Sequence, residues 1–242
     1  MKKGNEIAVV GATSSMAQPL CHRLAIKGCR LVLIGRDEAE LKLLASDIRI
    51  RHGIESRIVV LDVLDEKFAP DTLIEQVGNF DDMVIALGDL PQEDLFLPHG
   101  VAYCVHVNYT APAIIATSAA THLAKKGKGS ITIISSVAGD RGRQSNYPYG
   151  AAKAALTEFA SGLRNRYAKQ GVHVMTVKPG FVDTPMTWNL SSPLVADRNL
   201  AARIIANGME KKKDSIYVPF FWRFIMLLIC LIPERIFKKL SL

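Results

Sequence analysis

Three polar side chains in the middle of the chain have the types and spacing of an acid–base centre. Tyr149 and Lys153 lie one helical turn apart, so a helix places the phenol and the ammonium on the same face. A free phenol has a pKa of about 10, and a nearby ammonium favours the phenolate and lowers that pKa. The Ser136 hydroxyl is suited to orient a carbonyl oxygen while the phenol donates a proton. The hydride for such a reduction must come from a cofactor.

The elements expected around these residues support that interpretation. A Tyr-x-x-x-Lys pair alone also arises by chance on a solvated helix. Here, however, an apolar run at 131–134 predicts a buried strand, and a polar loop containing Ser136 follows it. Pro148 then marks a helix start, where its missing N–H costs nothing. We therefore predict catalytic roles for Ser136, Tyr149 and Lys153.

A second candidate site lies at the start of the chain. Residues 6–10 are an apolar run typical of a central parallel strand, and a turn of small residues separates them from an apolar-periodic helix. Free N–H groups and the positive end of the helix dipole favour an anion at such a turn. The turn is therefore predicted to bind the phosphates of a dinucleotide, although an ordinary turn is the alternative. The predicted ligands are Gly11, Thr13, Ser14, Ser15 and Met16.

The end of the second predicted strand, at 30–34, bears on cofactor choice. Arg36 follows Gly35 there, and an arginine can pair with the additional phosphate of NADP. The alternative is a solvated Arg36 beside Asp37 as a helix N-cap. The sequence thus favours NADP(H), with NAD(H) possible.

Length and composition indicate one α/β domain. The 242 residues alternate strand and helix patterns without a linker or repeat. The apolar run at 7–10 is too short for a secretory signal peptide, and the four cysteines lack a Cys-x-x-Cys spacing. The six histidines include no His-Glu-x-x-His, so we expect reduced thiols and no metal site.

The Ser136/Tyr149/Lys153 set and the turn at Gly11 resemble the short-chain dehydrogenase/reductase family over residues 6–218. The resemblance implies a Rossmann-type doubly wound parallel sheet in a domain at 1–218. Two motifs depart from the family pattern. Ser15 and Ala17 replace the second and third glycines of the turn, and only Gly88 remains of the Asn-Asn-Ala-Gly segment after the fourth strand, expected at 82–88.

The resemblance also implies further site residues. Asn108, on a helix expected at 99–124, corresponds to the asparagine that completes a proton relay by holding a water near the lysine; a solvent-facing polar residue is the alternative. Asp62 and Val63 would lie beside the adenine, although Asp62 could equally cap a loop. The remaining cofactor contacts implied are Gly88, Tyr149, Lys153, Pro179, Gly180, Val182 and Thr184.

The tail at 219–242 differs in character from the rest of the chain. Residues 203–242 hold eight Lys/Arg against three Asp/Glu, which is +5 of the total +7. Only nine apolar residues separate Arg223 from Pro233, short of the roughly 20 that span a bilayer. Aromatic and apolar residues flanked by basic ones predict a helix in the membrane interface, so that the protein is cytoplasmic and peripheral on the inner face of the cytoplasmic membrane. The alternative is packing on the protein or a partner subunit. Nucleic-acid binding is not expected.

A finer resemblance lies in segments 135–147, 162–166 and 177–186 and in the aromatic tail, which are similar to the decaprenylphosphoryl-2-keto-β-D-erythro-pentose reductases. It implies reduction of the C2 ketone of a polyprenyl-phosphate pentose made by a partner oxidase, in a homodimer or homotetramer joined by the helix after Pro148. Arg141 and Arg143 would hold a substrate phosphate unless they are merely solvated. Met186 and Trp188 would belong to a mobile lid at 185–195.

Two alternatives to that function are open. One is a reductase of another membrane lipid ketone, such as a 3-ketosphinganine or a 3-ketoacyl lipid. The other is a non-catalytic nucleotide-binding scaffold, which the presence of Asn108, Ser136, Tyr149 and Lys153 together disfavours.

Overall fold

A seven-stranded parallel sheet forms the centre of the protein in the computed structural model, which describes residues 2–91, 94–188 and 192–240. The strand order is β3-β2-β1-β4-β5-β6-β7. The order reverses between β1 and β4, so the crevice of a doubly wound sheet opens there, beyond the carboxyl ends of the strands. The strands are β1 (Glu6–Val10), β2 (Arg30–Gly35), β3 (Ser56–Val60), β4 (Asp82–Ile85), β5 (Gly129–Ile134), β6 (Val172–Pro179) and β7 (Ser215–Val218).

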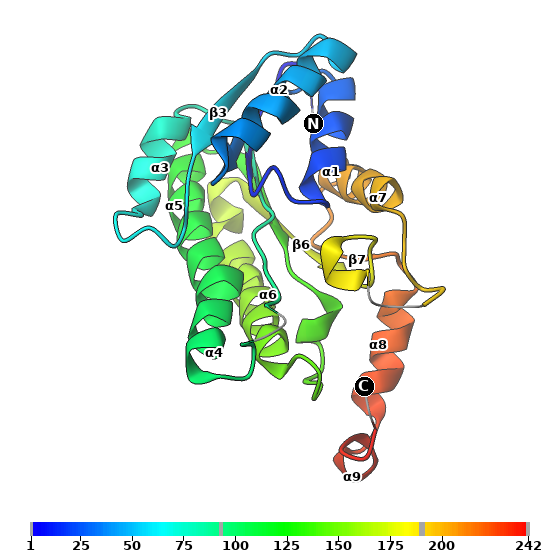
Figure 1. Cartoon of the computed structure of the whole chain (residues 1–242). Helices are drawn as coiled ribbons and strands as arrows, with labels where there is room; N and C mark the ends of the chain where they lie inside the picture. The colour runs from blue at the N-terminus through cyan, green and yellow to red at the C-terminus, as the bar shows by residue number, and fades with distance from the viewer. Residues whose placement is uncertain (1, 92–93, 189–191, 241–242) are drawn as a thin grey trace.

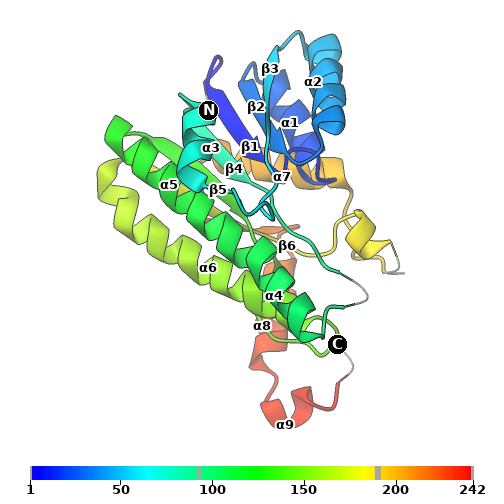
Figure 2. The same cartoon turned by 60° about the vertical axis from the view of Figure 1, so that its left-hand side comes forward.

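Helices cover both faces of the sheet (Figures 1 and 2). Helices α1, α2 and α7 pack on one face, and α3 to α6 lie on the other. The central strands are consequently apolar on both sides, as the runs at 7–10 and 31–34 predict. The helices are α1 (Ala17–Ile26), α2 (Glu38–His52), α3 (Pro70–Val77), α4 (Pro98–Val105), α5 (Ala111–Lys126), α6 (Tyr147–Tyr167), α7 (Arg198–Glu210), α8 (Trp222–Leu231) and α9 (Glu234–Phe237).

The predicted single α/β domain with a doubly wound parallel sheet is confirmed. Several expected bounds are wrong. The fourth strand ends at Ile85 rather than at residue 88. The helix expected at 99–124 is interrupted, since His106–Thr110 is a π-helical turn between α4 and α5. Helix α3 was not predicted; Pro70 at its first turn is the signal that could have found it.

The tail folds back on the domain through one face of α8. Trp222 and Met226, one turn apart, are buried against Val137, with Phe181 and Tyr217 packed around them. The opposite face, which carries Leu227, Leu228 and Leu231, is exposed and apolar. No helix in the described part of the chain is long and apolar enough to cross a bilayer.

Candidate active site

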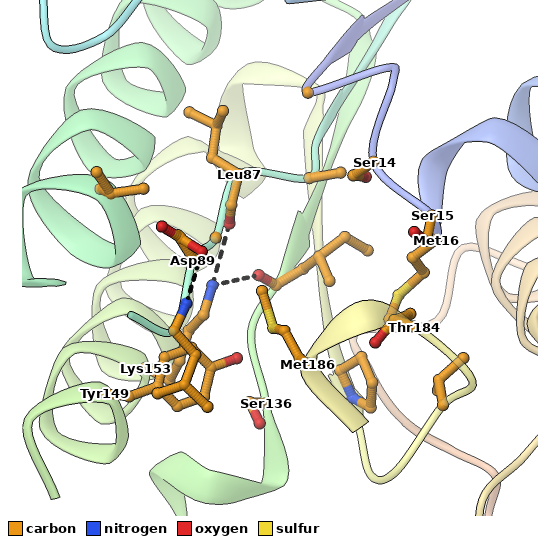
Figure 3. A pocket seen from close by; sticks show the side chains of 18 of the residues that line it. Ser14, Ser15, Met16, Leu87, Asp89, Ser136, Tyr149, Lys153, Thr184 and Met186 are labelled. Atoms are coloured by element: carbon orange, nitrogen blue, oxygen red, sulfur yellow. Dashed lines mark hydrogen bonds between the residues drawn. The ribbon is translucent and has the colours of Figure 1, made fainter. Parts of the chain in front are cut away.

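One cavity of about 1150 Å³ opens at the carboxyl ends of the strands, beside the reversal between β1 and β4. Ligand pockets usually measure roughly 300–1,000 Å³, so this cavity has room for a cofactor and a second molecule. Every residue predicted to bind the cofactor lines it, and so do Ser136, Tyr149 and Lys153 (Figure 3). The structure therefore brings together the turn after β1, the loop after β5 and the start of α6.

Ser136, Tyr149 and Lys153 face the same part of the cavity (Figure 3). The Ser136 side chain hydrogen-bonds the Tyr149 phenol. The Nζ of Lys153 lies 5.7 Å from the centroid of the Tyr149 ring. It donates hydrogen bonds to the carbonyl oxygens of Leu87 at 3.1 Å and Ile134 at 3.3 Å, which join the ends of β4 and β5. The three side chains thus lie together where β4 and β5 end, at the edge of the sheet.

The start of α6 packs closely on the loop that carries Ser136. A Cβ on Gly139 would lie 2.7 Å from the main-chain nitrogen of Ala154, and one on Gly150 would lie 2.9 Å from the carbonyl oxygen of Ala138. Ser135 donates from its hydroxyl to the carbonyl oxygen of Lys153 at 2.9 Å. Small residues on both segments therefore fix the distance between Ser136 and the helix.

The pKa values of this pair differ from the expectation that Lys153 lowers the pKa of Tyr149. Burial raises the pKa of Tyr149 to about 12, and the hydrogen bond from Ser136 only partly opposes it. Burial also lowers the pKa of Lys153 to about 8. The reason is that both groups are desolvated and the ammonium is bound to two main-chain carbonyls. Tyr149 is consequently held as a neutral phenol at neutral pH, which is the form that donates a proton.

Asn108 lies behind the cavity rather than in its wall. It is fully buried in the π-helical turn. Its amide donates to the carbonyl oxygens of Asp89 at 2.7 Å and Cys104 at 3.0 Å, and its Oδ1 accepts from the N–H of Asp89 at 3.1 Å. A Cβ on Gly88 would lie 3.1 Å from this Oδ1 and 3.0 Å from the Nζ of Lys153. Asn108 is thus next to the lysine and is not solvent-facing, which agrees with the frequent use of π-turns at functional sites.

The turn after β1 has the shape of a cradle for a phosphate. Gly11 has φ of +75°, and a Cβ there would lie 2.7 Å from the carbonyl oxygen of Ala86. Ser14 Oγ accepts from the N–H of Ala17 at 3.2 Å, which sets the first turn of α1. The turn therefore approaches β4 closely and presents the helix N-terminus to the cavity, so these residues fit a dinucleotide despite the missing glycines.

Arg36 and Asp62 line the cavity at the ends of β2 and β3. Asp37 is the N-cap of α2 and accepts from the N–H of Glu40 at 3.0 Å, which leaves Arg36 exposed at the cavity wall. Asp62 also caps a turn, since its carboxylate accepts from the N–H of Leu64 at 2.9 Å. The structure is therefore compatible with both roles considered for Asp62, a loop cap and a position beside the adenine.

The four residues predicted to contact substrate separate into two pairs. Arg143 and Met186 line the cavity, whereas Arg141 and Trp188 are not among its described lining residues. Trp188 is 72% exposed, and residues 189–191 of the expected lid lie outside the described residues.

The substrate role predicted for Arg141 is corrected by its contacts. Its guanidinium donates to the carbonyl oxygens of Cys230 and Ile232, both at 3.0 Å, and pairs with Glu234 at 2.8 Å. It also stacks 4.1 Å from the centroid of the Phe237 ring. Free carbonyls at the end of a helix attract a cation, so Arg141 holds the end of α8 against the loop that follows β5.

Sequence reasoning missed two parts of the cavity wall. Asp89 lines it, with its carboxylate accepting from the hydroxyl of Tyr103 at 2.7 Å. The tail contributes Trp222, Ile225 and Ile229. Their helical spacing within an almost wholly apolar segment was the available signal, but nothing in the sequence indicated where that face packs.

Comparison with known proteins agrees with this geometry. A family model described as short chain dehydrogenase matches residues 5–194. An uncharacterized oxidoreductase of Mycobacterium tuberculosis is 30% identical over 241 residues, covering 97% of this chain and 96% of that protein. The structure of a bulky-bulky ketone specific alcohol dehydrogenase from Comamonas testosteroni has a TM-score of 0.80 at 24% identity over 95% of each chain. A short-chain dehydrogenase from Sphingobium yanoikuyae in complex with NADPH has a TM-score of 0.82 at 20% identity, over 95% of this chain and 97% of that one.

Proposed function

The chain belongs to the short-chain dehydrogenase family and is an NAD(P)-dependent oxidoreductase, and from this we propose that it reduces a ketone on a lipid-linked substrate to a secondary alcohol. The observation that carries the proposal is the position of Tyr149. Its neutral phenol, bonded to Ser136, faces a cavity that is also lined by the apolar side chains of Trp222, Ile225 and Ile229 on α8. A proton donor and an apolar wall in one cavity suit a ketone with a hydrocarbon part.

In the proposed mechanism, each polar residue has one task. A bound nicotinamide supplies the hydride. Ser136 holds the carbonyl oxygen, and Tyr149 donates the proton to it. Lys153 binds the nicotinamide ribose and holds the positive charge beside the phenol, while Asn108 positions the segment at Gly88 and Asp89 and links the lysine to solvent. The turn from Gly11 to Met16 would hold the phosphates, and the segment from Pro179 to Thr184 would cover the nicotinamide, since both line the cavity.

The substrate we propose is a polyprenyl-phosphate pentose with a C2 ketone, reduced to the arabinose configuration after a partner oxidase has made the ketone. Support comes from Ile225 and Ile229, which offer an apolar surface to a prenyl chain. The test is to follow NADPH and NADH consumption with this ketone generated by such an oxidase. Consumption with formation of the arabinose lipid is expected. Consumption only with a sugar-free keto lipid, such as 3-ketosphinganine, would replace the pentose by the second candidate, which the apolar wall also accommodates.

We propose NADP(H) as the preferred cofactor because Arg36 is exposed at the cavity wall beyond β2. The Sphingobium yanoikuyae neighbour holds NADPH, in keeping with this choice. Arg36→Ala should raise KM for NADPH about tenfold or more, since a charged hydrogen bond to the additional phosphate is lost. KM for NADH should change little. Steady-state kinetics with both cofactors provide the measurement, and Arg49→Ala, an exposed arginine on α2, is the matched control. Equal effects of Arg36→Ala on both cofactors would contradict the assignment.

We propose that residues 219–242 are a membrane-associated tail and that its exposed face binds an anionic bilayer surface from the cytoplasmic side. The support is an apolar surface with basic residues nearby. Leu227, Leu228 and Leu231 are each more than half exposed, while Arg235 and Lys239 lie beyond the end of α8. The same placement would bring the cavity close to a lipid substrate.

Leu228→Glu with Leu231→Glu should lower the fraction bound to vesicles of phosphatidylglycerol and phosphatidylcholine about tenfold or more, because two leucines no longer enter the bilayer. Sedimentation of the vesicles measures it. The control is Leu43→Glu with Ile50→Glu, equally exposed residues on α2. Wild-type protein that stays in the supernatant, or a double variant that sediments like wild type, would refute membrane binding.

We also propose a homodimer or homotetramer joined along α6. Its exposed positions include Ala151, Ser161 and Gly162, whose small side chains allow a second helix to approach closely.

A further inference from the structure

The guanidinium of Arg143 faces the cavity without a strong hydrogen-bond acceptor. Its Nε is buried and has no partner among the described residues. Its Nη2 contacts only a weak acceptor, the sulfur of Met226 on α8, at 3.2 Å. Burial lowers the pKa of this side chain. A desolvated cation in this position is costly unless an anion meets it.

The carboxylate whose charge acts on Arg143 already has two partners. Asp140 pairs with Lys178 at 2.7 Å and accepts from the hydroxyl of Tyr217 at 2.9 Å. Asp140 therefore interacts with Arg143 by long-range electrostatic attraction and not by a hydrogen bond. A direct anionic partner for Arg143 would have to come from a ligand.

The turn that carries Arg143 also carries another unsatisfied group. Asn146 closes this turn, with its N–H donating to the carbonyl oxygen of Arg143 at 3.2 Å, and its buried Oδ1 has no partner in the described part of the chain. It lines the cavity three positions before Tyr149. An amide oxygen here can accept from a hydroxyl of a molecule that reaches Tyr149.

The position of Arg143 separates it from the phosphate cradle of the cofactor. The cradle follows β1, whereas Arg143 lies in the loop after β5, two strands away in the sheet, and touches α8. The wall beside it is Ile225 and Ile229, on the helix that Arg141 fastens. The Arg143 guanidinium and the apolar wall are thus neighbours in the part of the cavity away from the phosphate cradle, where the substrate is proposed to bind.

We propose that Arg143 is the receptor for an anionic group of the substrate, such as a phosphate, whose hydrocarbon part lies on Ile225 and Ile229. The inference rests on the proposed function and deepens it, because it assigns the recognition of the substrate's anionic group to one residue of the cavity wall. Guanidinium N–H groups match two oxygens of a phosphate or carboxylate, which gives both affinity and orientation to the ketone.

The experiment measures binding of farnesyl phosphate and of farnesol, at concentrations where both are monomeric, to the full chain saturated with NADPH. Isothermal titration gives both dissociation constants without any turnover. Wild type should bind farnesyl phosphate about tenfold to hundredfold more tightly than farnesol. Arg143→Gln should abolish this preference, and Arg143→Lys should restore part of it. Arg223→Gln, which removes an exposed charge from α8, should leave it unchanged.

Three results would overturn the proposal. The first is wild-type protein that binds neither probe or does not distinguish them. The second is a preference that survives in Arg143→Gln. The third is a fall in NADPH affinity in Arg143→Gln, which would assign the guanidinium to the cofactor instead. Failure of the proposed function would be seen in a different experiment, as the absence of ketone reduction by the wild-type protein. The two failures can be told apart because binding of the probes requires no reaction.

Discussion

Tyr149→Phe is expected to lower kcat for ketone reduction about 10³-fold, with KM and NADPH affinity nearly unchanged. In the proposed mechanism the phenol is the proton donor, and general acid catalysis contributes roughly 10²–10⁴-fold. Burial keeps its pKa at about 12, so the group carries a proton throughout the working range and Phe removes only that proton and the bond to Ser136. Loss confined to kcat indicates an interaction made in the transition state.

The measurement is single-turnover reduction together with an NADPH titration. Tyr147→Phe is the matched control, because that tyrosine lies two positions earlier in α6 and is 52% exposed. It should retain wild-type rates. Activity of Tyr149→Phe within about tenfold of wild type would remove Tyr149 from the chemistry.

Lys153→Met should lower kcat/KM about 10²-fold or more and also weaken NADPH binding. The buried ammonium bridges the carbonyl oxygens of Leu87 and Ile134 and faces the cavity beneath Gly88. Methionine has similar length but donates no hydrogen bond, so both the charge and the bridge are lost. Lys128→Met, a change at an exposed residue just before the amino end of β5, should have no effect on either quantity.

The same lysine predicts the pH profile. Burial lowers its pKa to about 8, so the ammonium loses its proton as the pH rises through that value. Reduction should therefore decline above about pH 8, long before the Tyr149 phenol ionises near 12. A profile that stays level to pH 9, or a Lys153→Met enzyme with wild-type kcat/KM, would contradict this role.

The residues predicted to bind the cofactor all line one cavity, and the reason is physical. Gly11, Arg36, Asp62 and Gly88 each follow the end of a parallel strand, and the carboxyl ends of parallel strands meet at one edge of a sheet. Locating the strands therefore locates the residues, even where Ser15 replaces a glycine. The π-turn around Asn108 was not predictable, because it depends on contacts with Asp89 from another element.

The substrate side was predicted less well because it depends on long-range packing. Arg141 and Arg143 are two positions apart with the same chemistry, yet one fastens the end of α8 and the other faces the cavity. Their difference is set by where the tail lies, and composition describes the tail only as apolar and basic. The pKa of Tyr149 was misjudged for a related reason, since helical spacing gives the distance to Lys153 but not the burial of both.

The most direct test of reduction at Tyr149 follows deuterium from NADPH labelled at the transferable C4 position. The labelled cofactor is incubated with the polyprenyl-phosphoryl 2-keto-pentose and either wild-type or Tyr149→Phe protein, and the product is analysed by mass spectrometry. The account predicts one deuterium at the new carbinol carbon with wild type, and almost none with Tyr149→Phe despite bound cofactor. Equal deuterium transfer by both proteins, or none by wild type with any ketone lipid, would contradict it.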